Sequence, residues 1–283
     1  MSIKNLLQLL KPVRLTEIVD IGANPIDGEP PYRPMMAAKH LCRVTGFEPQ
    51  QDALNALLTK KGQNERYLPY AIGNGSEQTL NICQVSGMTS LLTPDKNMLQ
   101  TFGIFAEFGR VIEQIPISTR TLDSIDEIVH LDYLKIDIQG GEMDVFKHGR
   151  QKLAKTVAIQ TEISFMPLYE NQPTFAEIDA ELRSQGFVPH CFAAMKNWII
   201  SPLVINNNPR IPLNQLMEAD MVYVRDFTKP DSMSNEQLKH LALISHICYQ
   251  SFDLTMRCVQ LLEQRGVLAK GAVERYPQMI SNE

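Results

Sequence analysis

The sequence predicts an α/β protein: a Rossmann-like, mostly parallel sheet with helices on both faces, plus a C-terminal helical extension. Three observations support this prediction. Short apolar runs alternate with helical patterns from about residue 15 to residue 190, which is typical of β-α-β units. Polar residues and glycines follow several of these runs, where the strands of such a sheet end. A stripe of apolar residues at helical spacing follows residue 234.

The expected elements alternate along the chain. Met1 to Leu10 predict a short amphipathic helix, so 1–14 are assigned to an N-terminal helix and 15–200 to a core domain. Strands are expected at 17–22, 43–48, 66–72, 78–84, 110–117, 132–138, 156–163 and 187–193. Helices are expected at 33–41, 50–61, 122–129, 141–148 and 174–185.

The last range, 201–283, is assigned to a loop, a final strand and the helical extension. Three prolines and an Asn run predict a long loop at 201–214, and an apolar run predicts a strand at 218–226. Ser234 and Gln237 can cap a helix that begins there. Apolar residues then recur every three or four positions, so we expect one long helix up to about Gly266.

Charge and cysteine content exclude several classes of protein. The net charge is −5, and no basic run or basic stripe between aromatic residues indicates a nucleic-acid-binding face. The five cysteines are scattered and include no Cys-x-x-Cys pair, which favours reduced thiols in a cytoplasmic protein. The N-terminal apolar stretch is too short for a secretory signal or a membrane span.

Two strand ends indicate a cofactor. The segment Glu17-Ile-Val-Asp-Ile-Gly-Ala-Asn24 predicts a buried strand that ends in a tight loop, where Gly22 permits close approach of the backbone to a ligand. A second strand ends in Phe47-Glu48-Pro49. A carboxylate at the tip of the second strand accepts hydrogen bonds from ribose hydroxyls in nucleotide-binding α/β folds. We therefore expect an adenosine-containing cofactor.

The spacing of the glycines narrows the choice of cofactor. After Gly22 the next glycine is Gly28, so the close glycines that bring a pyrophosphate to a helix N-terminus are missing. S-adenosylmethionine has no phosphate and does not need that spacing. The expected cofactor-binding residues are Asp20, Gly22, Ala23, Asn24, Glu48, Pro49, Ala71 and Ile72. The pair Ala71–Ile72 can pack on an adenine face, although an ordinary turn fits the same residues.

Three carboxylates are candidates for catalysis. Asp137 ends the buried strand Leu134-Lys-Ile-Asp137 and can act as a general base or hold a metal. Glu142 opens the following helix, where it can also simply stabilise the helix dipole. Glu162 lies within an apolar run, where a carboxylate needs either a basic partner or a role at the site. The sequence contains no metal-binding motif, so no residue is assigned as a metal ligand.

The motifs together resemble those of the FkbM family of S-adenosylmethionine-dependent methyltransferases. Asp20-Ile-Gly-Ala-Asn24 is similar to the first motif of the family and Phe47-Glu48-Pro49 to its acidic second motif. The most distinctive block is Thr121-Leu-Asp-Ser124 followed by Leu134-Lys-Ile-Asp-Ile-Gln-Gly-Gly-Glu142. Segments between Glu162 and Phe187 continue the resemblance in order. It covers roughly residues 15–190 and implies the Rossmann-like methyltransferase fold.

The resemblance implies methyl transfer to a hydroxyl of a sugar, a polysaccharide or a related natural product. Asp137 is then the expected base, or the group that positions the acceptor. Two departures stand out: Pro25 to Tyr32 replace a loop with an earlier glycine, and Gln139 stands where many members have Glu. Loops at 85–109 and 193–214 are expected to shape the acceptor pocket. The C-terminal helix can support a homodimer or pack back on the sheet.

Two other classes of function fit parts of the sequence. One is a nucleotide-dependent sugar oxidoreductase or epimerase on a similar sheet, against which the missing Gly-x-Gly-x-x-Gly counts. The other is a non-catalytic binding module that keeps the methyltransferase fold. The presence of both Asp20 and Glu48 favours a working cofactor site over such a module.

Overall fold

A seven-stranded sheet forms the centre of the computed structural model, which describes residues 3–24, 28–38 and 41–280. The strand order is β3-β2-β1-β7-β8-β10-β9. The first five strands in this order run parallel, whereas β10 runs antiparallel to both of its neighbours. The strands are β1 (Thr16–Ile21), β2 (Cys42–Phe47), β3 (Glu65–Leu68), β7 (Tyr133–Ile136), β8 (Ala158–Ser164), β9 (Phe187–Trp198) and β10 (Gln215–Arg225). The predicted mostly parallel sheet is confirmed.

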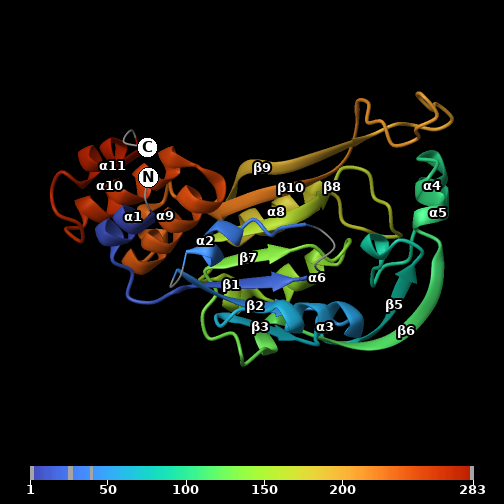
Figure 1. Ribbon diagram of the computed structural model, residues 1–283, viewed down its shortest axis with the longest axis horizontal. Coiled ribbons are helices and arrows are strands. Elements are labelled where there is room, and N and C mark those ends of the chain that lie inside the picture. Colours follow the sequence, from blue (N-terminus) through green and yellow to red (C-terminus); the bar gives the residue numbers. More distant parts are fainter. Residues whose placement is uncertain (1–2, 25–27, 39–40, 281–283) are drawn as a thin grey trace.

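A smaller sheet and a helical group lie at opposite ends of the large sheet (Figure 1). The smaller sheet has the order β4-β6-β5, with β4 (Ala71–Ile72), β5 (Glu77–Cys83) and β6 (Val111–Arg120). The helical group combines the expected N-terminal helix α1 (Ile3–Leu10) with α9 (Asn235–Tyr249), α10 (Phe252–Gln264) and α11 (Ala272–Ile280). Both chain ends therefore lie in the same part of the molecule.

The other helices have ten residues or fewer. The α-helices are α2 (Arg33–Ala37), α3 (Gln51–Lys60), α4 (Lys96–Thr101), α5 (Phe105–Phe108), α6 (Glu142–Lys147), α7 (Arg150–Leu153) and α8 (Phe175–Ser184). The 3₁₀ helices are η2 (Ser86–Met88), η3 (Leu122–Ser124) and η4 (Pro230–Ser232). Within the described ranges, no helix combines the length and the apolar character that crossing a bilayer requires.

The central strands are buried on both faces because alternate side chains enter two different cores. Ile18 and Tyr133 pack with residues of α9 and α10 on one face. Val19 and Leu134 pack with residues of α6 and α8 on the other face. The order β3-β2-β1-β7-β8 is the doubly wound arrangement, in which the order reverses between β1 and β7. Ligands bind beyond the carboxyl ends of the strands at such a reversal.

The expected single helix from Ser234 to Gly266 is wrong. Its start is as predicted, since Ser234 and Gln237 form a capping box. The helix then ends at Tyr249, where Gln250 takes a left-handed conformation with φ 52°, and α10 starts at Phe252. Both helices bury their apolar residues in the same core. The apolar stripe that the two helices share therefore looks continuous in the sequence, although the chain turns between Tyr249 and Phe252.

The expected helix at 122–129 is also wrong. Only Leu122–Ser124 is helical, as a 3₁₀ turn. The amides of Ile125 and Ile128 then bond to the carbonyls of Leu122 and Ile125. These successive tight turns bury Leu122, Ile125 and Ile128. Buried residues three positions apart are thus compatible with turns as well as with an α-helix.

Four further expectations need correction. The helix expected at 33–41 ends at Ala37, and residues 39–40 of that prediction lie outside the described residues. The strand expected at 66–72 is divided at Pro69, because proline has no N–H for a continuing ladder. Its halves β3 and β4 belong to different sheets. The expected loop 85–109 contains η2, α4 and α5, and β9 extends to Trp198, into the expected loop 193–214.

The division of the chain into 1–14, 15–200 and 201–283 stays a prediction. The structure adds that β10, which belongs to the last range, lies inside the sheet between β8 and β9. The long loop predicted at 201–214 connects those two strands. The final range thus contributes a strand to the same sheet as the core.

Candidate functional site

The loop after β1 is built around a close contact with the end of β7. The amides of Gly22 and Ala23 donate to the carbonyl oxygen of Phe47, each at 3.1 Å. The amide of Asp137 donates to the carbonyl oxygen of Ile21 at 3.1 Å. Gly22 has φ 77°, and a Cβ atom there would lie 2.0 Å from the Asp137 carbonyl oxygen. Glycine is therefore required twice, for the conformation and for the space.

Gly22→Ala is expected to destabilise the protein by more than the conformational cost of a positive φ, about 1–2 kcal/mol. The loss of stability beyond that conformational cost measures the steric overlap of the added Cβ with the Asp137 carbonyl group. Gly266→Ala is the matched control, because Gly266 has φ 69° and no described atom within 4 Å of an added Cβ. Denaturant unfolding of both variants makes the comparison. Equal losses of stability would mean that the close contact contributes nothing.

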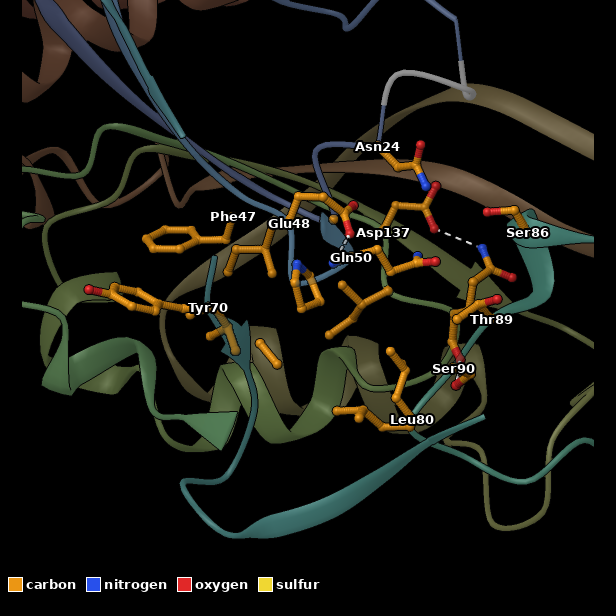
Figure 2. Close-up of a pocket in the computed structure, with 18 of the residues that line it drawn as sticks. Asn24, Phe47, Glu48, Gln50, Tyr70, Leu80, Ser86, Thr89, Ser90 and Asp137 are labelled. Carbon is orange, nitrogen blue, oxygen red and sulfur yellow. Dashed lines mark hydrogen bonds between the residues drawn. The ribbon is translucent and has the colours of Figure 1, made fainter. Parts of the chain in front are cut away.

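A cleft opens where the ends of β1, β2 and β7 meet, and we call it the strand-end cleft. Asn24, Glu48 and Asp137 point into it from three different strand ends (Figure 2). The residues that line it are Ile21, Gly22, Asn24, Phe47, Glu48, Pro49, Gln50, Tyr70, Ala71, Ile72, Leu80, Ser86, Gly87, Thr89, Ser90, Leu91, Asp137, Ile138 and Gln139. Six of the eight residues predicted to bind a cofactor are among them.

Glu48 is held in place by its own loop. The side chain is 2% exposed, and Oε1 accepts a hydrogen bond of 2.7 Å from the amide of Gln50. This contact fixes the carboxylate at the tip of β2 before any ligand binds. A preorganised carboxylate can then accept hydrogen bonds from vicinal hydroxyls at little further entropic cost.

The rest of the cleft is largely apolar. The ring of Tyr70 stacks on Phe47 with centroids 6.2 Å apart and planes at 26°, and Ile72 and Leu80 extend this surface. Such a wall suits a flat aromatic ligand. Sequence reasoning missed Tyr70 and Leu80. It expected the loop 85–109 to shape the acceptor pocket, whereas polar residues of 86–90 line this cleft. The segment 86–90 comes to the cleft through η2, within a stretch expected to be a loop.

Asp137 and Glu162 are joined by one side chain. Nε2 of Gln139 donates to Oδ1 of Asp137 at 2.8 Å and to Oε2 of Glu162 at 2.9 Å. Oε1 of Gln139 accepts from the hydroxyl of Tyr169 at 3.3 Å. Each carboxylate accepts one hydrogen bond from the side-chain amide of Gln139. This contact orients Asp137 toward the cleft. Gln139 therefore has a contact that a glutamate at the same position cannot make, because an ionised carboxylate only accepts hydrogen bonds.

Glu142 does not line the cleft, but it holds the loop after β7 through a hydrogen bond. It is 4% exposed at the start of α6, and its Oε1 accepts from the amide of Ile138 at 2.9 Å. Burial raises the pKa of Glu142 from 4.5 to about 7, against the lowering effect of backbone hydrogen bonds. The carboxyl group holds the loop after β7 in position. Its contacts suit a positioning residue.

Glu142→Gln is expected to flatten the pH dependence of folding. The pKa of Glu142 is higher in the folded protein, about 7, than in the unfolded chain. Its contribution to stability is therefore fully present below about pH 4.5 and is lost as the pH rises through about 7, a total of about 3 kcal/mol. Glutamine keeps an oxygen for Ile138 but does not titrate. Denaturant unfolding of wild type and variant from pH 4.5 to pH 8 measures the difference. Parallel curves would contradict this account.

Glu162 and Asp220 complete a cluster of carboxylates with Asp137. One oxygen from each of the three lies within 4.8 Å of the others, which is a geometry that can hold a metal ion. Lys196 Nζ lies 3.4 Å from Oε1 of Glu162. Burial first, and then the charge of Asp137, raises the pKa of Glu162 well above its usual range. Asp220 was missed in the sequence because it comes from the antiparallel strand β10.

Asp20 and Ala23 face a second depression, which we call the sheet-face groove. Its residues include Asp20, Ala23, Lys135, Gln160 and Asp220, and it shares Asn24 and Asp137 with the strand-end cleft. Oδ2 of Asp20 accepts a hydrogen bond of 2.5 Å from the hydroxyl of Tyr32. The structure thus separates these two residues from the other six predicted to bind a cofactor.

Comparisons with known proteins agree with the sequence motifs. A family model described as the methyltransferase FkbM domain matches residues 20–189. No curated protein matches the chain. This match favours a methyltransferase over the oxidoreductase or epimerase that the sequence also allowed.

Several solved methyltransferase structures are similar in outline. Magnesium protoporphyrin IX methyltransferase from Synechocystis PCC 6803 has 8% identity and a TM-score of 0.40, over 79% of this chain and 78% of that one. An S-adenosylmethionine-dependent methyltransferase from Aquifex aeolicus has 10% identity and a TM-score of 0.33, over 79% and 97%. The 16S rRNA (adenine(1408)-N(1))-methyltransferase from Catenulisporales acidiphilia has 11% identity and a TM-score of 0.36, over 80% and 92%.

Proposed function

The chain belongs to the FkbM methyltransferase family, whose cofactor is S-adenosylmethionine, and we propose that it methylates a hydroxyl oxygen of a sugar, a polysaccharide or a related natural product. The observation that carries the proposal is the meeting of Glu48 and Asp137 in one cleft beside the Gly22 loop. A ribose-binding acid and a base for a hydroxyl group are then within reach of one bound cofactor.

The strand-end cleft suits the parts of S-adenosylmethionine. Glu48 would accept hydrogen bonds from the ribose hydroxyls. Tyr70, Ile72 and Leu80 offer an apolar wall for the adenine ring, and the loop from Gly22 to Asn24 would hold the amino-acid end. When bound, the cofactor would supply an electrophilic methyl group, whose carbon an acceptor oxygen can attack as the C–S bond breaks and S-adenosylhomocysteine leaves.

Asp137 would accept the proton of the attacking hydroxyl group. Its carboxylate is oriented by the amide of Gln139, and Oδ2 takes no part in that hydrogen bond. Alignment of the acceptor oxygen with the methyl group supplies much of the rate enhancement of such a displacement. Removal of the hydroxyl proton adds to it. Glu162 shares the same amide and would keep Asp137 in place.

Transfer of labelled methyl groups tests this function. Purified protein is incubated with methyl-labelled S-adenosylmethionine and cell extract, and the glycan, lipid-linked, small-molecule, protein and nucleic-acid pools are then separated. We expect label in a glycan or natural-product pool, stable to the mild alkali that cleaves methyl esters. Label confined to protein or nucleic acid would contradict the proposed acceptor. No label in any pool would favour a non-catalytic binding module.

The cellular location and the oligomeric state stay predictions. The scattered cysteines of the sequence favour a cytoplasmic protein. The C-terminal helices were expected either to dimerise or to pack on the sheet, and α9 and α10 pack against it. Cell fractionation checks the location, and light scattering of the purified protein checks for a homodimer.

A further inference from the structure

One face of the large sheet changes from apolar to polar along its strands. Ile18 and Tyr133 lie in the core under α9 and α10. Two residues further along β1 and β7, on the same face, stand Asp20 and Lys135, which are register partners. Lys135 is in turn the partner of Gln160 on β8. Strands of a covered parallel sheet are normally apolar on both faces, so this polar row requires an explanation.

A second polar row continues toward the strand ends. Glu162 on β8 and Asp220 on β10 are register partners, and both lie beside Asp137. All residues of the two rows except Glu162 line the sheet-face groove, whose other side includes Tyr32, Arg33 and Met36. The groove shares Asp137 and Asn24 with the strand-end cleft. A molecule in this groove can therefore reach the proposed base from the side opposite to the cleft.

Two carboxylates of the groove have unused hydrogen-bonding capacity. Asp20 is only 4% exposed, yet its Oδ1 has no hydrogen-bond partner among the described residues, and Lys135 Nζ lies 3.6 Å away. Asp220 is half-buried, and none of the described residues donates a hydrogen bond to its carboxylate. Buried acceptors without donors are uncommon in folded proteins. Both side chains would be satisfied by donors from a ligand.

The charge of the groove limits what that ligand can be. The groove is lined by five acids (Asp20, Glu29, Glu65, Asp137 and Asp220) and three cations (Arg33, Lys60 and Lys135). At its Asp137 end, Glu162 lies beside Asp137 and Asp220, and Lys196 is shared between Glu162 and Glu218 at 3.4 and 2.5 Å. Ionised carboxylates accept hydrogen bonds but cannot donate them. Hydroxyl and ammonium groups are therefore favourable here. At the Asp137 end of the groove, a carboxylate or phosphate of a ligand would meet the like charge of Asp137 and Asp220.

Resting on the proposed function, we infer that the sheet-face groove holds the methyl acceptor and selects a carbohydrate without negative charge near the methylated hydroxyl. Neutral and amino-bearing sugars are the class that fits. Asp20 and Asp220 bind hydroxyl or ammonium groups of the acceptor, and Asp137 receives the hydroxyl proton. Uronic acids and sugar phosphates are excluded by the same carboxylates.

Saturation-transfer NMR with three methyl glycosides tests the inference. The protein is first saturated with S-adenosylhomocysteine, and the methyl glycosides of glucosamine, glucose and glucuronic acid are then titrated in EDTA. We expect glucosamine to bind most tightly, glucose less tightly and glucuronate least. Asp220→Asn is expected to weaken glucosamine binding roughly tenfold, the loss of one hydrogen bond between charged groups. Asp231→Asn, an exposed acid outside the groove, is the control and should bind like wild type.

The outcomes separate this inference from the proposed function. Failure of S-adenosylhomocysteine to bind counts against the proposed function itself. Normal cofactor binding with glucuronate bound as tightly as glucosamine overturns the inference alone, as does no binding of any glycoside. An unchanged preference in Asp220→Asn, with cofactor affinity intact as proof of folding, also overturns it. Glucuronate binding that appears only with Mg²⁺ would mean that the carboxylates hold a metal instead.

Discussion

Asp137→Asn is expected to lower the rate of methyl transfer roughly 10²- to 10⁴-fold, the range typical for loss of a positioned base. The variant keeps the shape of the side chain and an oxygen that can accept from Gln139 Nε2. It cannot take up the hydroxyl proton. Because the geometry is preserved, binding of S-adenosylmethionine should stay close to that of wild type.

Single-turnover transfer of labelled methyl groups measures this effect, once an acceptor pool has been identified. Glu170→Gln is a suitable control, because Glu170 is exposed and lies outside the residues that line the strand-end cleft. Full turnover of Asp137→Asn with normal cofactor affinity would remove the proton-accepting role. Alignment of the acceptor by other groups would then account for catalysis.

Glu48→Ala is expected to weaken binding of S-adenosylmethionine about 10- to 100-fold, since a hydrogen bond to a charged group contributes roughly 1.5–3 kcal/mol. The carboxylate is buried at the tip of β2 and held by the amide of Gln50. Its loss removes the expected acceptor for the ribose hydroxyls and leaves that amide without its partner.

Isothermal titration calorimetry with S-adenosylmethionine and S-adenosylhomocysteine measures this loss. Glu48→Gln separates the effect of the charge from that of the contact with Gln50, because the variant keeps an oxygen that can accept from the Gln50 amide. Asp52→Asn, an exposed acid in the first turn of α3, is the control. An affinity of Glu48→Ala equal to that of wild type would show that the ribose lies elsewhere.

The parts of the site that sequence could predict lie at the ends of parallel strands. Gly22, Glu48 and Asp137 are far apart in the chain, yet each follows an apolar run that forms a parallel strand. Because such strands end at one edge of the sheet, their end residues meet. The same reasoning predicts that these strand ends meet at one edge of the sheet, without any knowledge of the loops.

Other parts of the site depend on information that local patterns do not contain. Asp20 stands one residue before the end of β1, and alternation of side chains turns it to the groove instead of the cleft. Asp220 reaches the site because β10 inserts antiparallel between β8 and β9. A strand at 218–226 was expected, but neither its position nor its direction in the sheet follows from its own residues.

Turns are the other feature of the fold that the sequence patterns did not predict. The break at Gln250 requires a left-handed residue that no glycine marks, so two helices look like one. The segment 86–90 has few apolar residues and no strong helical spacing, yet η2 places it at the cleft. Tertiary packing determines the conformation and the position of such segments.

Hydrogen exchange followed by mass spectrometry tests most directly whether the strand-end cleft is the cofactor site. The exchange of backbone amides is compared with and without saturating S-adenosylhomocysteine. Protection is predicted in peptides that contain 21–24, 48–50, 70–72 and 137–139, the segments that line the cleft. Peptides of α9 and α10 should exchange unchanged. Protection confined to the helical group, or no protection with a bound ligand, would contradict the account.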